Sequence, residues 1–275
     1  MPHEMPTIEL GPHRVSRLIV GANPVLGYSY MGAMLGRFML DHFTPDNTHR
    51  LLARCLDQGI NTWQTSAHEK VEQALDRLRH EGRSLHWILL TSEGDDRVQD
   101  LAATVRRYHP IAVVHHGGVS DRLYREGRIA QVREFTQRVR DLGVLAGVSA
   151  HDPAVIRHVE DAGWEVDLYM TCFYRLTRTP EELQEGMREV PVWGNFLPGD
   201  PARMTEVVRQ VQRPCLAFKI LAGGRRAERP EDAEACFEFA FRSIKPGDGV
   251  IVGMFPRFRD EAEENAAWAR RYGVA

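Results

Sequence analysis

The stretch Leu145-Ala146-Gly147-Val148-Ser149-Ala150-His151-Asp152-Pro153 decides the fold of this chain. It starts with a short apolar run typical of a buried strand and ends in polar residues. Asp152 followed by Pro153 is typical of a helix start, because Asp caps free backbone N–H groups and Pro fits the first helical position. Strand, polar strand end and helix together make one βα unit.

The same order of strand, polar end and helix occurs eight times in the 275 residues. Repeated βα units with mostly short connections predict parallel strands. Eight units in this length predict an α/β protein with a single (β/α)8 TIM-barrel domain over residues 1–275. The rival is a doubly wound open sheet, which usually has a glycine-rich phosphate loop after its first strand. Gly21-Ala22-Asn23-Pro24 does not fit that loop, so the barrel is favoured.

Two features beyond the barrel are expected. Thr7–Leu10 and residues 14–17 flank Gly11-Pro12-His13, which predicts a β-hairpin over the bottom of the barrel. The connections at residues 25–43 and 174–198 are longer than usual. The aromatic and Met content of the first favours a packed, lid-like loop over the barrel mouth.

Composition bounds the function. The chain is 43% hydrophobic and 27% charged, with a net charge of −3, so nothing indicates a nucleic-acid or membrane partner. Its apolar runs are far shorter than the roughly 20 residues of a membrane span. Four dispersed cysteines without a CxxC motif fit a reducing compartment. We therefore expect a cytoplasmic protein that acts on a small molecule, with its oligomeric state left open.

The carboxyl ends of barrel strands converge on one face, which holds the chemistry in TIM-barrel enzymes. Alternation along each strand predicts which side chains point into the barrel. Bulky Leu216, Phe218 and Ile220 are assigned to the helix-facing side. His115 is placed on the side of Val113. The predicted inward set is Gln64, Gly147, Ser149, His151, Cys215, Ala217 and Lys219.

Histidines and Lys219 are the catalytic candidates. His115 and His151 would act as acid and base or as metal ligands, with Glu69 and Lys219 assisting. His68, His115 and His151 form a candidate set for a divalent metal, although no HxH or HExxH spacing supports it. The alternative is a pocket lined by neutral, hydrogen-bonded histidines. For Lys219 the alternative is an ion pair with Glu69 or Asp152.

Further residues are candidates for ligand binding. Loops after the last two barrel strands often bind phosphate, so Gly223, Gly224 and Arg225 are anion- or cofactor-binding candidates, with a solvated turn as the alternative. Aromatic and polar side chains at strand ends and in the long loops would contact the substrate. These substrate-binding candidates are Asn23, Gln64, His116, Ser149, Tyr174 and Phe218.

Five segments in order carry a family resemblance. They are Leu10-Gly11 with Val15-Ser16-Arg17-Leu18; Gly59-Ile60-Asn61-Thr62-Trp63-Gln64-Thr65-Ser66; Gly147-Val148-Ser149; Leu216-Ala217-Phe218 with Leu221-Ala222-Gly223; and Ile251 with Gly253-Met254 and Glu263-Glu264-Asn265. Together they resemble the aldo-keto reductase superfamily, TIM-barrel enzymes that move hydride between NADPH and carbonyl compounds. The resemblance implies a cofactor segment that includes Gly253 and Asn265.

The catalytic tetrad of that family does not carry over. Gln64 stands at the Asp position, Glu69 at the Tyr position and Ser92 at the Lys position, while His115 matches the His. The missing Tyr is the acid that protonates the carbonyl oxygen, and the missing Lys lowers its pKa. An ordinary NADPH-dependent carbonyl reductase is therefore not expected.

Three functional interpretations stay open. The first is an enzyme that uses acid/base or metal-assisted chemistry, as an isomerase, lyase or hydrolase, on a small polar, sugar-like or carbonyl substrate. The second is a divergent NAD(P)-dependent oxidoreductase with His115 as proton donor and Phe218 as the nicotinamide platform. The third is a non-catalytic small-molecule-binding protein. The sequence leaves the cofactor open between a divalent metal and NAD(P).

Overall fold

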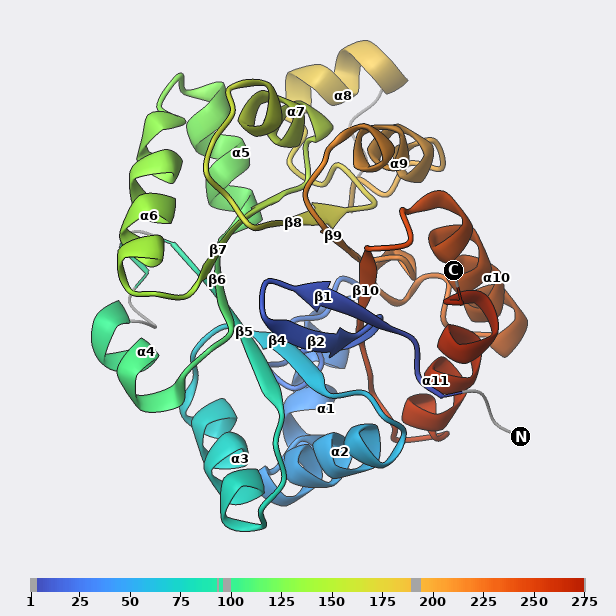
Figure 1. Cartoon of the computed structure of the whole chain (residues 1–275). Coiled ribbons are helices and arrows are strands. Elements are labelled where there is room, and N and C mark those ends of the chain that lie inside the picture. The colour runs from blue at the N-terminus through green and yellow to red at the C-terminus, as the bar shows by residue number, and fades with distance from the viewer. Residues whose placement is uncertain (1–3, 93, 96–99, 189–193, 275) are drawn as a thin grey trace.

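The computed structural model describes residues 4–92, 94–95, 100–188 and 194–274. Eight parallel strands close into a barrel in the order β10-β3-β4-β5-β6-β7-β8-β9, so the predicted TIM barrel is confirmed (Figure 1). The barrel strands are β3 (Leu18–Gly21), β4 (Thr62–Thr65), β5 (His86–Thr91), β6 (Ala112–His115), β7 (Leu145–Ala150), β8 (Leu168–Cys172), β9 (Cys215–Phe218) and β10 (Gly249–Gly253).

Helices surround the barrel and cover the outer faces of the strands (Figure 1). Several begin at side-chain caps: the Thr44 side chain accepts from Asn47 N, and Asp152, the cap expected from sequence, accepts from Ala154 N. The helices are α1 (Ala33–His42), α2 (Pro45–Asp57), α3 (Glu69–His80), α4 (Leu101–Tyr108), α5 (Gly117–Arg125), α6 (Ala130–Asp141), α7 (Pro153–Asp161), α8 (Pro180–Met187), α9 (Asp200–Gln210), α10 (Pro230–Ser243) and α11 (Glu261–Tyr272), with a short 3-10 turn, η1 (Ala222–Gly224).

The first long connection is more helical than expected, whereas the second holds the short helix that the sequence predicts near residues 180–188. Residues 25–43 are not one loop, because α1 occupies their second half. Residues 174–198 contain α8, which begins with a reciprocal cap between Thr179 and Glu182. Residues 189–193 of that connection lie outside the described residues. Helix α5, between β6 and α6, was not predicted.

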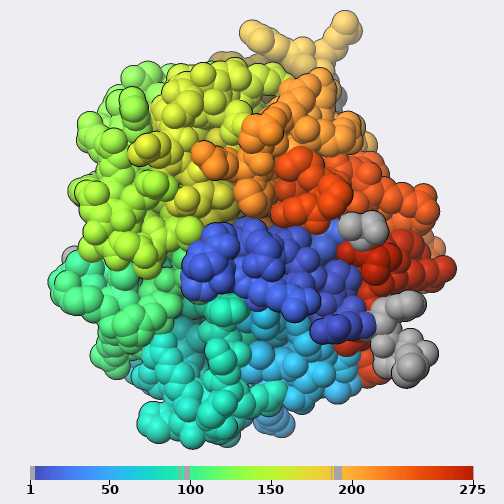
Figure 2. All heavy atoms as spheres, in the orientation of Figure 1, coloured from blue at the N-terminus to red at the C-terminus, as the bar shows by residue number. Residues whose placement is uncertain are grey.

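The hairpin of β1 (Thr7–Leu10) and β2 (His13–Ser16) covers the amino-terminal end of the barrel, as predicted. Its apolar side chains Ile8, Leu10 and Val15 are buried and belong to the same cluster as the inward-facing Ile19 and Leu216. In the space-filling view the hairpin fills the centre of this face (Figure 2). The opposite end, where the strands finish, is left for a site.

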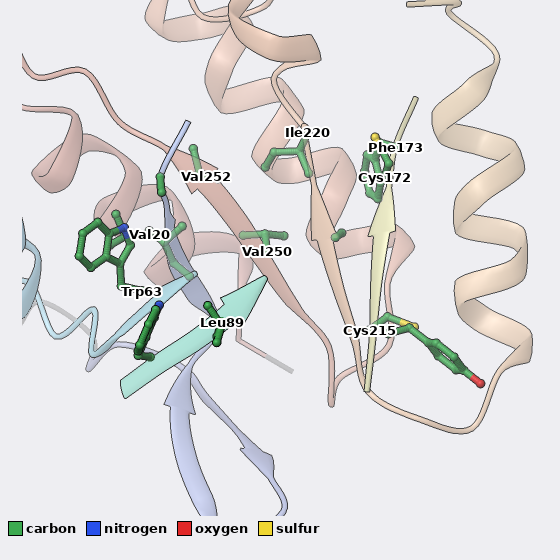
Figure 3. Close-up of a cluster of buried hydrophobic side chains, with 14 of the residues drawn as sticks. Val20, Trp63, Leu89, Cys172, Phe173, Cys215, Ile220, Val250 and Val252 are labelled. Carbon is green, nitrogen blue, oxygen red and sulfur yellow. The ribbon is translucent and has the colours of Figure 1, made fainter. Parts of the chain in front are cut away.

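Two apolar clusters show which side of each strand points inward. One lies inside the barrel; the other lies between the barrel and the helices, and Figure 3 shows some of its members. Leu216 belongs to the inner cluster, whereas Cys215 and Ala217 belong to the outer one. The predicted alternation of β9 is therefore wrong by one residue. Among the described residues, no helix is both long and apolar enough to cross a membrane.

Candidate functional site

A cavity of about 930 Å³ opens at the carboxyl ends of the strands. This volume lies at the upper end of the usual range for small-molecule sites. The cavity collects side chains from the ends of most barrel strands, as expected for the fold. The predicted site residues that line it are Asn23, Gln64, His116, Ser149, His151, Phe218, Lys219, Gly223, Gly224, Arg225, Gly253 and Asn265.

His151 follows the end of β7 and is held by a buried carboxylate from α5. Asp121 Oδ2 accepts from the backbone N–H of His151 at 3.0 Å and lies 3.0 Å from its Nδ1. The N–H of Asp152 donates to Asp121 Oδ1 at 3.2 Å. The side chain of Asp121 is fully buried. Asp121 therefore fixes both the backbone and the ring of His151.

This contact also fixes the protonation state of His151. A carboxylate beside Nδ1 requires a proton on that nitrogen, so the neutral ring carries its lone pair on Nε2. Nε2 has no hydrogen-bond partner among the described residues. Burial lowers the pKa of His151, Asp121 opposes that effect, and the charge of Lys219 lowers the pKa further. The imidazole is thus a neutral base beside the cavity.

Lys219 directly follows β9 and has left-handed backbone, with φ of 58°. Its Nζ lies 4.5 Å from the ring centre of Phe218 and 4.8 Å from that of Tyr30. The rings of His151 and Phe218 also pack in a T-shaped arrangement, with 5.6 Å between ring centres. The base and the ammonium group therefore contact the same aromatic ring in one cavity.

Lys219 makes no ion pair with any described residue, so neither expected partner neutralises it. Glu69 accepts a hydrogen bond from Gln73 instead. Asp152 pairs with Arg175 at 2.6 Å. A left-handed conformation costs a non-glycine residue about 1–2 kcal/mol. The strained position therefore presents an unpaired cation to the cavity, which is the pattern expected of a functional residue.

His115 lies on the wrong side of its strand for a catalytic role. It is buried in the helix layer, where its ring packs against Phe135 at 5.0 Å and Nδ1 lies 2.8 Å from Ser120 Oγ. The expectation that His115 faces the barrel mouth is wrong, because the side shared with Val113 is the outer one. Its neighbour His116 lines the cavity instead.

Three other predicted site residues also lie away from the cavity. His68 is exposed and caps α3, accepting from Lys70 N, and Glu69 is exposed on the same helix. Tyr174 is buried in the outer core and packs against Phe196, with 5.1 Å between ring centres. None of the three lines the cavity.

The structure does not bring the three candidate metal ligands together. His68 is exposed, His115 faces the helices and His151 faces the cavity, so the three imidazoles do not converge. Among the residues that the structure places, no group of three or more His, Cys, Asp or Glu could hold a metal ion.

The glycine-rich turn after β9 has an explanation within the chain. Gly223 and Gly224 have φ of 63° and 99°, and a Cβ on Gly223 would lie 3.0 Å from that of Tyr30. Close packing against Tyr30 therefore requires glycine there, with or without a bound phosphate. Arg225 stacks on Phe196 at 4.1 Å and makes no ion pair with any described residue. The cation, rather than the glycines, makes this wall suitable for an anion.

Asp121 was missed by sequence reasoning. Asp121 occupies a buried position of α5, where a carboxylate needs a special partner. That position would have been informative had the helix been recognised. The segment after β3 supplies a wall of large apolar side chains: Tyr28, Tyr30, Met31, Leu35 and Met39.

No model of a known protein family matches this chain, and no curated protein sequence matches it. Solved structures do match. A glycerol dehydrogenase from Gluconobacter oxydans is 11% identical, with 100% of this chain and 92% of that chain covered and a TM-score of 0.56. An aldo-keto reductase from Bacillus halodurans is 14% identical, with 98% and 95% covered and a TM-score of 0.57.

A third matching structure is named for a different reaction. A truncated 3-deoxy-D-arabino-heptulosonate 7-phosphate synthase from Thermotoga maritima is 14% identical, with 98% and 91% covered and a TM-score of 0.54. Identities this low show the shared TIM-barrel fold alone. Reductases and a synthase match about equally, so the aldo-keto reductase resemblance is not singled out.

Proposed function

We propose that the protein is an enzyme that moves a proton at a carbon next to a carbonyl group, as an isomerase or lyase. The observation that carries the proposal is the His151–Asp121 pair, which faces the same cavity as the unpaired ammonium group of Lys219. A buried, neutral base beside a cation is suited to this chemistry, because the base removes a proton while the cation stabilises the resulting oxyanion.

The mechanism follows from these positions. The carbonyl oxygen lies near Lys219 Nζ, and Nε2 of His151 takes the proton from the adjacent carbon. The electron pair of the broken C–H bond forms a C=C bond and the π pair of the carbonyl moves to the oxygen, which gives an enolate paired with the ammonium group. Asp121 stabilises the imidazolium through Nδ1–H. With an α-hydroxy carbonyl substrate the enolate is an enediolate; the hydroxyl proton moves to the other oxygen, and the imidazolium returns its proton to the former carbonyl carbon, which completes an isomerisation. With a leaving group on the carbon beyond, that group departs with its bonding electron pair as the carbonyl re-forms, which completes a lyase reaction.

Because His151 is neutral in the free protein, it would start the reaction cycle as a base rather than as an acid. Burial lowers its pKa, so the free ring is unprotonated near neutral pH. The polar side chains of Gln64, Ser149 and His116 line the same cavity and are suited to orient the substrate oxygens. These contacts support an enzyme rather than a passive binding protein, since simple binding does not need a base aligned by a buried carboxylate.

Proton exchange in heavy water tests the proposal without knowledge of the full reaction. The protein is incubated in D2O with 2-oxohexanoate, dihydroxyacetone or butanone, and NMR follows loss of the proton next to the carbonyl. We expect catalysed exchange that His151→Asn lowers by at least about 100-fold, the usual contribution of a general base. Exchange should also fall in Lys219→Met.

His80→Asn is the matched control, because His80 is exposed on α3 far from the site. It should leave exchange and thermal stability unchanged. Full exchange activity in His151→Asn would contradict the proposal, as would the absence of catalysed exchange with every carbonyl compound tried. In the latter case, saturable binding without exchange would favour a binding protein.

A divergent NAD(P)-dependent oxidoreductase is the second candidate, and one observation favours it. Gly253 and Asn265, which the family resemblance assigns to cofactor binding, line the same cavity as Phe218. So does Arg225, an anion-binding candidate because it lies in the loop after one of the last two barrel strands. Arg225 and Arg259 would hold the phosphates of the NAD(P) cofactor, and its nicotinamide would supply hydride. His115 could not donate the proton there, because it faces the helix layer. Quenching of NADPH fluorescence at micromolar protein, lost in Arg225→Met, would favour this candidate.

A further inference from the structure

The walls of the cavity differ in polarity. Gln64, Ser149, His151 and Lys219 lie at the strand ends. The segment after β3 and the turn after β10 supply another part of the lining, in which large apolar and aromatic side chains predominate: Leu26, Tyr28, Tyr30, Met31, Leu35, Met39 and Phe255. Asn23 and Ser29 are the polar side chains of this part. A uniformly polar substrate would leave most of this wall without matching groups.

The apolar wall is firmly built. Backbone N–H groups of Leu26, Gly27 and Tyr28 donate to carbonyls of Ala22, Pro24 and Asn23, so the chain turns back sharply after β3. Helix α1 then packs directly on this turn. A Cβ on Gly36 would lie only 2.6 Å from the carbonyl oxygen of Gly27, so the contact is between backbones. The side chains of α1 are thereby held at fixed positions over the cavity.

The apolar surface continues from the cavity to the outside. Phe255 lines the cavity and packs edge-on against Phe38 at 5.7 Å between ring centres. Phe38 stacks in turn on Phe258, which is 80% exposed. Tyr28 and Met31 line the cavity and are themselves about half exposed. Exposed apolar surface beside a cavity mouth marks a binding surface more often than a surface without function.

The charges at the polar end favour an anionic group. Lys219 and Arg225 line the cavity and make no ion pair with any described residue. Arg259 is already paired with Glu264 at 3.1 Å. Two carboxylates, Glu228 and Glu261, also line the cavity. Glu261 accepts from the backbone N–H of Phe255 at 2.7 Å, and burial raises its pKa. Lys219 and Arg225 are therefore two cavity-lining cations that no carboxylate of the described residues pairs with. Within that part of the chain, Arg225 donates only to the carbonyl of Ala222.

We propose that the substrate is amphiphilic: an acidic carbonyl head binds at Lys219 and His151, and an apolar chain or ring lies against Tyr28, Met31, Leu35, Met39 and Phe255. This inference deepens the proposed function and rests on it for the reaction at the head. It narrows the small polar, sugar-like or carbonyl substrate expected from sequence to an acidic carbonyl compound whose affinity depends on apolar length.

Unreactive n-alkanoates test the proposal separately from catalysis. Butanoate, hexanoate and octanoate carry a carboxylate head but no ketone or aldehyde carbonyl, so they do not undergo the proposed proton exchange. Calorimetry measures their binding to the full chain. Burial of one methylene group corresponds to roughly a two- to fourfold gain in affinity. We therefore expect affinity to rise by about that factor per added methylene, at one site per chain. Equal affinity across the series, or no binding at all, would overturn the proposal.

A methionine pair on α1 gives a matched test of location. Met39 lines the cavity, whereas Met34 lies on the same helix, is 77% exposed and does not line it. Met39→Gln should weaken octanoate binding about tenfold and leave butanoate binding nearly unchanged. Met34→Gln should change neither. Equal loss in both variants, or none in Met39→Gln, would show that the chain binds elsewhere.

Two further variants separate the inference from the proposed reaction. Lys219→Met should weaken all three alkanoates by one common factor, because it removes the partner of the head. His151→Asn should abolish proton exchange and leave the increase of affinity with chain length intact. If exchange persists in His151→Asn while affinity still rises with length, the reaction is wrong and the ligand class stands. If exchange is lost and affinity does not rise with length, the reaction stands and the ligand class is wrong.

Discussion

The stability of the protein should depend on pH through His115, which lies outside the cavity. His115 is 1% exposed, its Nε2 has no hydrogen-bond partner, and it packs against Phe135. Ser120 Oγ donates to the carbonyl of His116, so the Nδ1–H of His115 donates to Ser120. A second proton on Nε2 would place a charge among apolar side chains without a partner. Burial accordingly lowers the pKa of His115 from 6.5 to about 4.

The size of the effect follows from this pKa. Between pH 6.5 and about 4, His115 binds a proton in the unfolded chain and not in the folded one. The stabilisation is therefore complete above pH 6.5 and is lost as the pH falls towards 4. The difference between the pKa of His115 in the unfolded and in the folded chain corresponds to about 3 kcal/mol of unfolding free energy, at about 1.4 kcal/mol per pKa unit. Most of it, about 2–3 kcal/mol, should already be lost at pH 4.5.

His115→Leu should remove this dependence. Urea unfolding of variant and wild type at pH 7.5 and 4.5 gives the difference in unfolding free energy at each pH. Other groups titrate in both proteins and cancel in this comparison. From pH 7.5 to pH 4.5, the unfolding free energy of the wild type should fall by about 2–3 kcal/mol more than that of His115→Leu. His80→Leu, at an exposed position, should show no such gain.

Two results would refute the reasoning about His115. Parallel stability curves for wild type and His115→Leu would mean that the buried imidazole does not titrate as argued. Loss of proton exchange in the folded His115→Leu variant, comparable to that in His151→Asn, would mean that His115 takes part in the reaction after all.

Three other variants test the site and the barrel end. Asp121→Asn should lower proton exchange by about 10²–10⁴-fold, because an amide no longer selects the Nδ1–H form of His151. The free energy of unfolding in urea should fall by about 1–3 kcal/mol. Unchanged exchange would contradict the proposed role. Lys219→Gly and Lys219→Met should both lose activity. The unfolding free energy of Lys219→Gly should be higher than that of Lys219→Met by about 0.5–1 kcal/mol, because glycine adopts the left-handed backbone without strain. Equal stability of the two variants would show that φ at this position carries no strain. Arg17→Met should cost about 3 kcal/mol or more in urea unfolding, because the buried guanidinium donates to the carbonyls of Asp248, Lys245 and Gly273; a cost below about 1 kcal/mol would mean that water replaces these bonds.

The order of βα units and the hairpin could be read from the sequence because each rests on local signals. Asp152-Pro153 starts a helix wherever it follows a strand, and Gly11 allows the tight turn between the hairpin strands. The convergence of strand ends then follows from barrel closure alone. Closure of the barrel therefore predicts that His151, Ser149 and Lys219 lie at one face.

The side on which each strand residue points could not be read in the same way. A barrel strand is buried on both sides, so apolar residues do not alternate with polar ones. In β6 all four residues from Ala112 to His115 are buried, and the pattern cannot tell which side meets the helices. The same ambiguity misplaced Phe218, which lies inside, and Cys215, which lies outside. The assignment of His115 failed for this reason.

Helix α5 was missed because its start looks like a loop. Gly117 and Gly118 both disfavour a helix, yet a Cβ on Gly117 would lie 2.9 Å from Ser149 Oγ and 3.2 Å from the His151 ring. Tertiary packing requires glycine there in spite of its poor helix propensity. Without this helix, the sequence could not reveal that Asp121 lies beside His151, since the two are 30 residues apart.

The shared contact of His151 and Lys219 with Phe218 has a stereochemical consequence. A flat carbonyl compound that rests on this ring with its oxygen at Lys219 presents one face to Nε2 of His151. The two hydrogens on the reacting carbon are then inequivalent, and only one would exchange with solvent. The deuterated product would be a single enantiomer rather than a racemate, and the handedness of the label would report which side of Phe218 the substrate occupies.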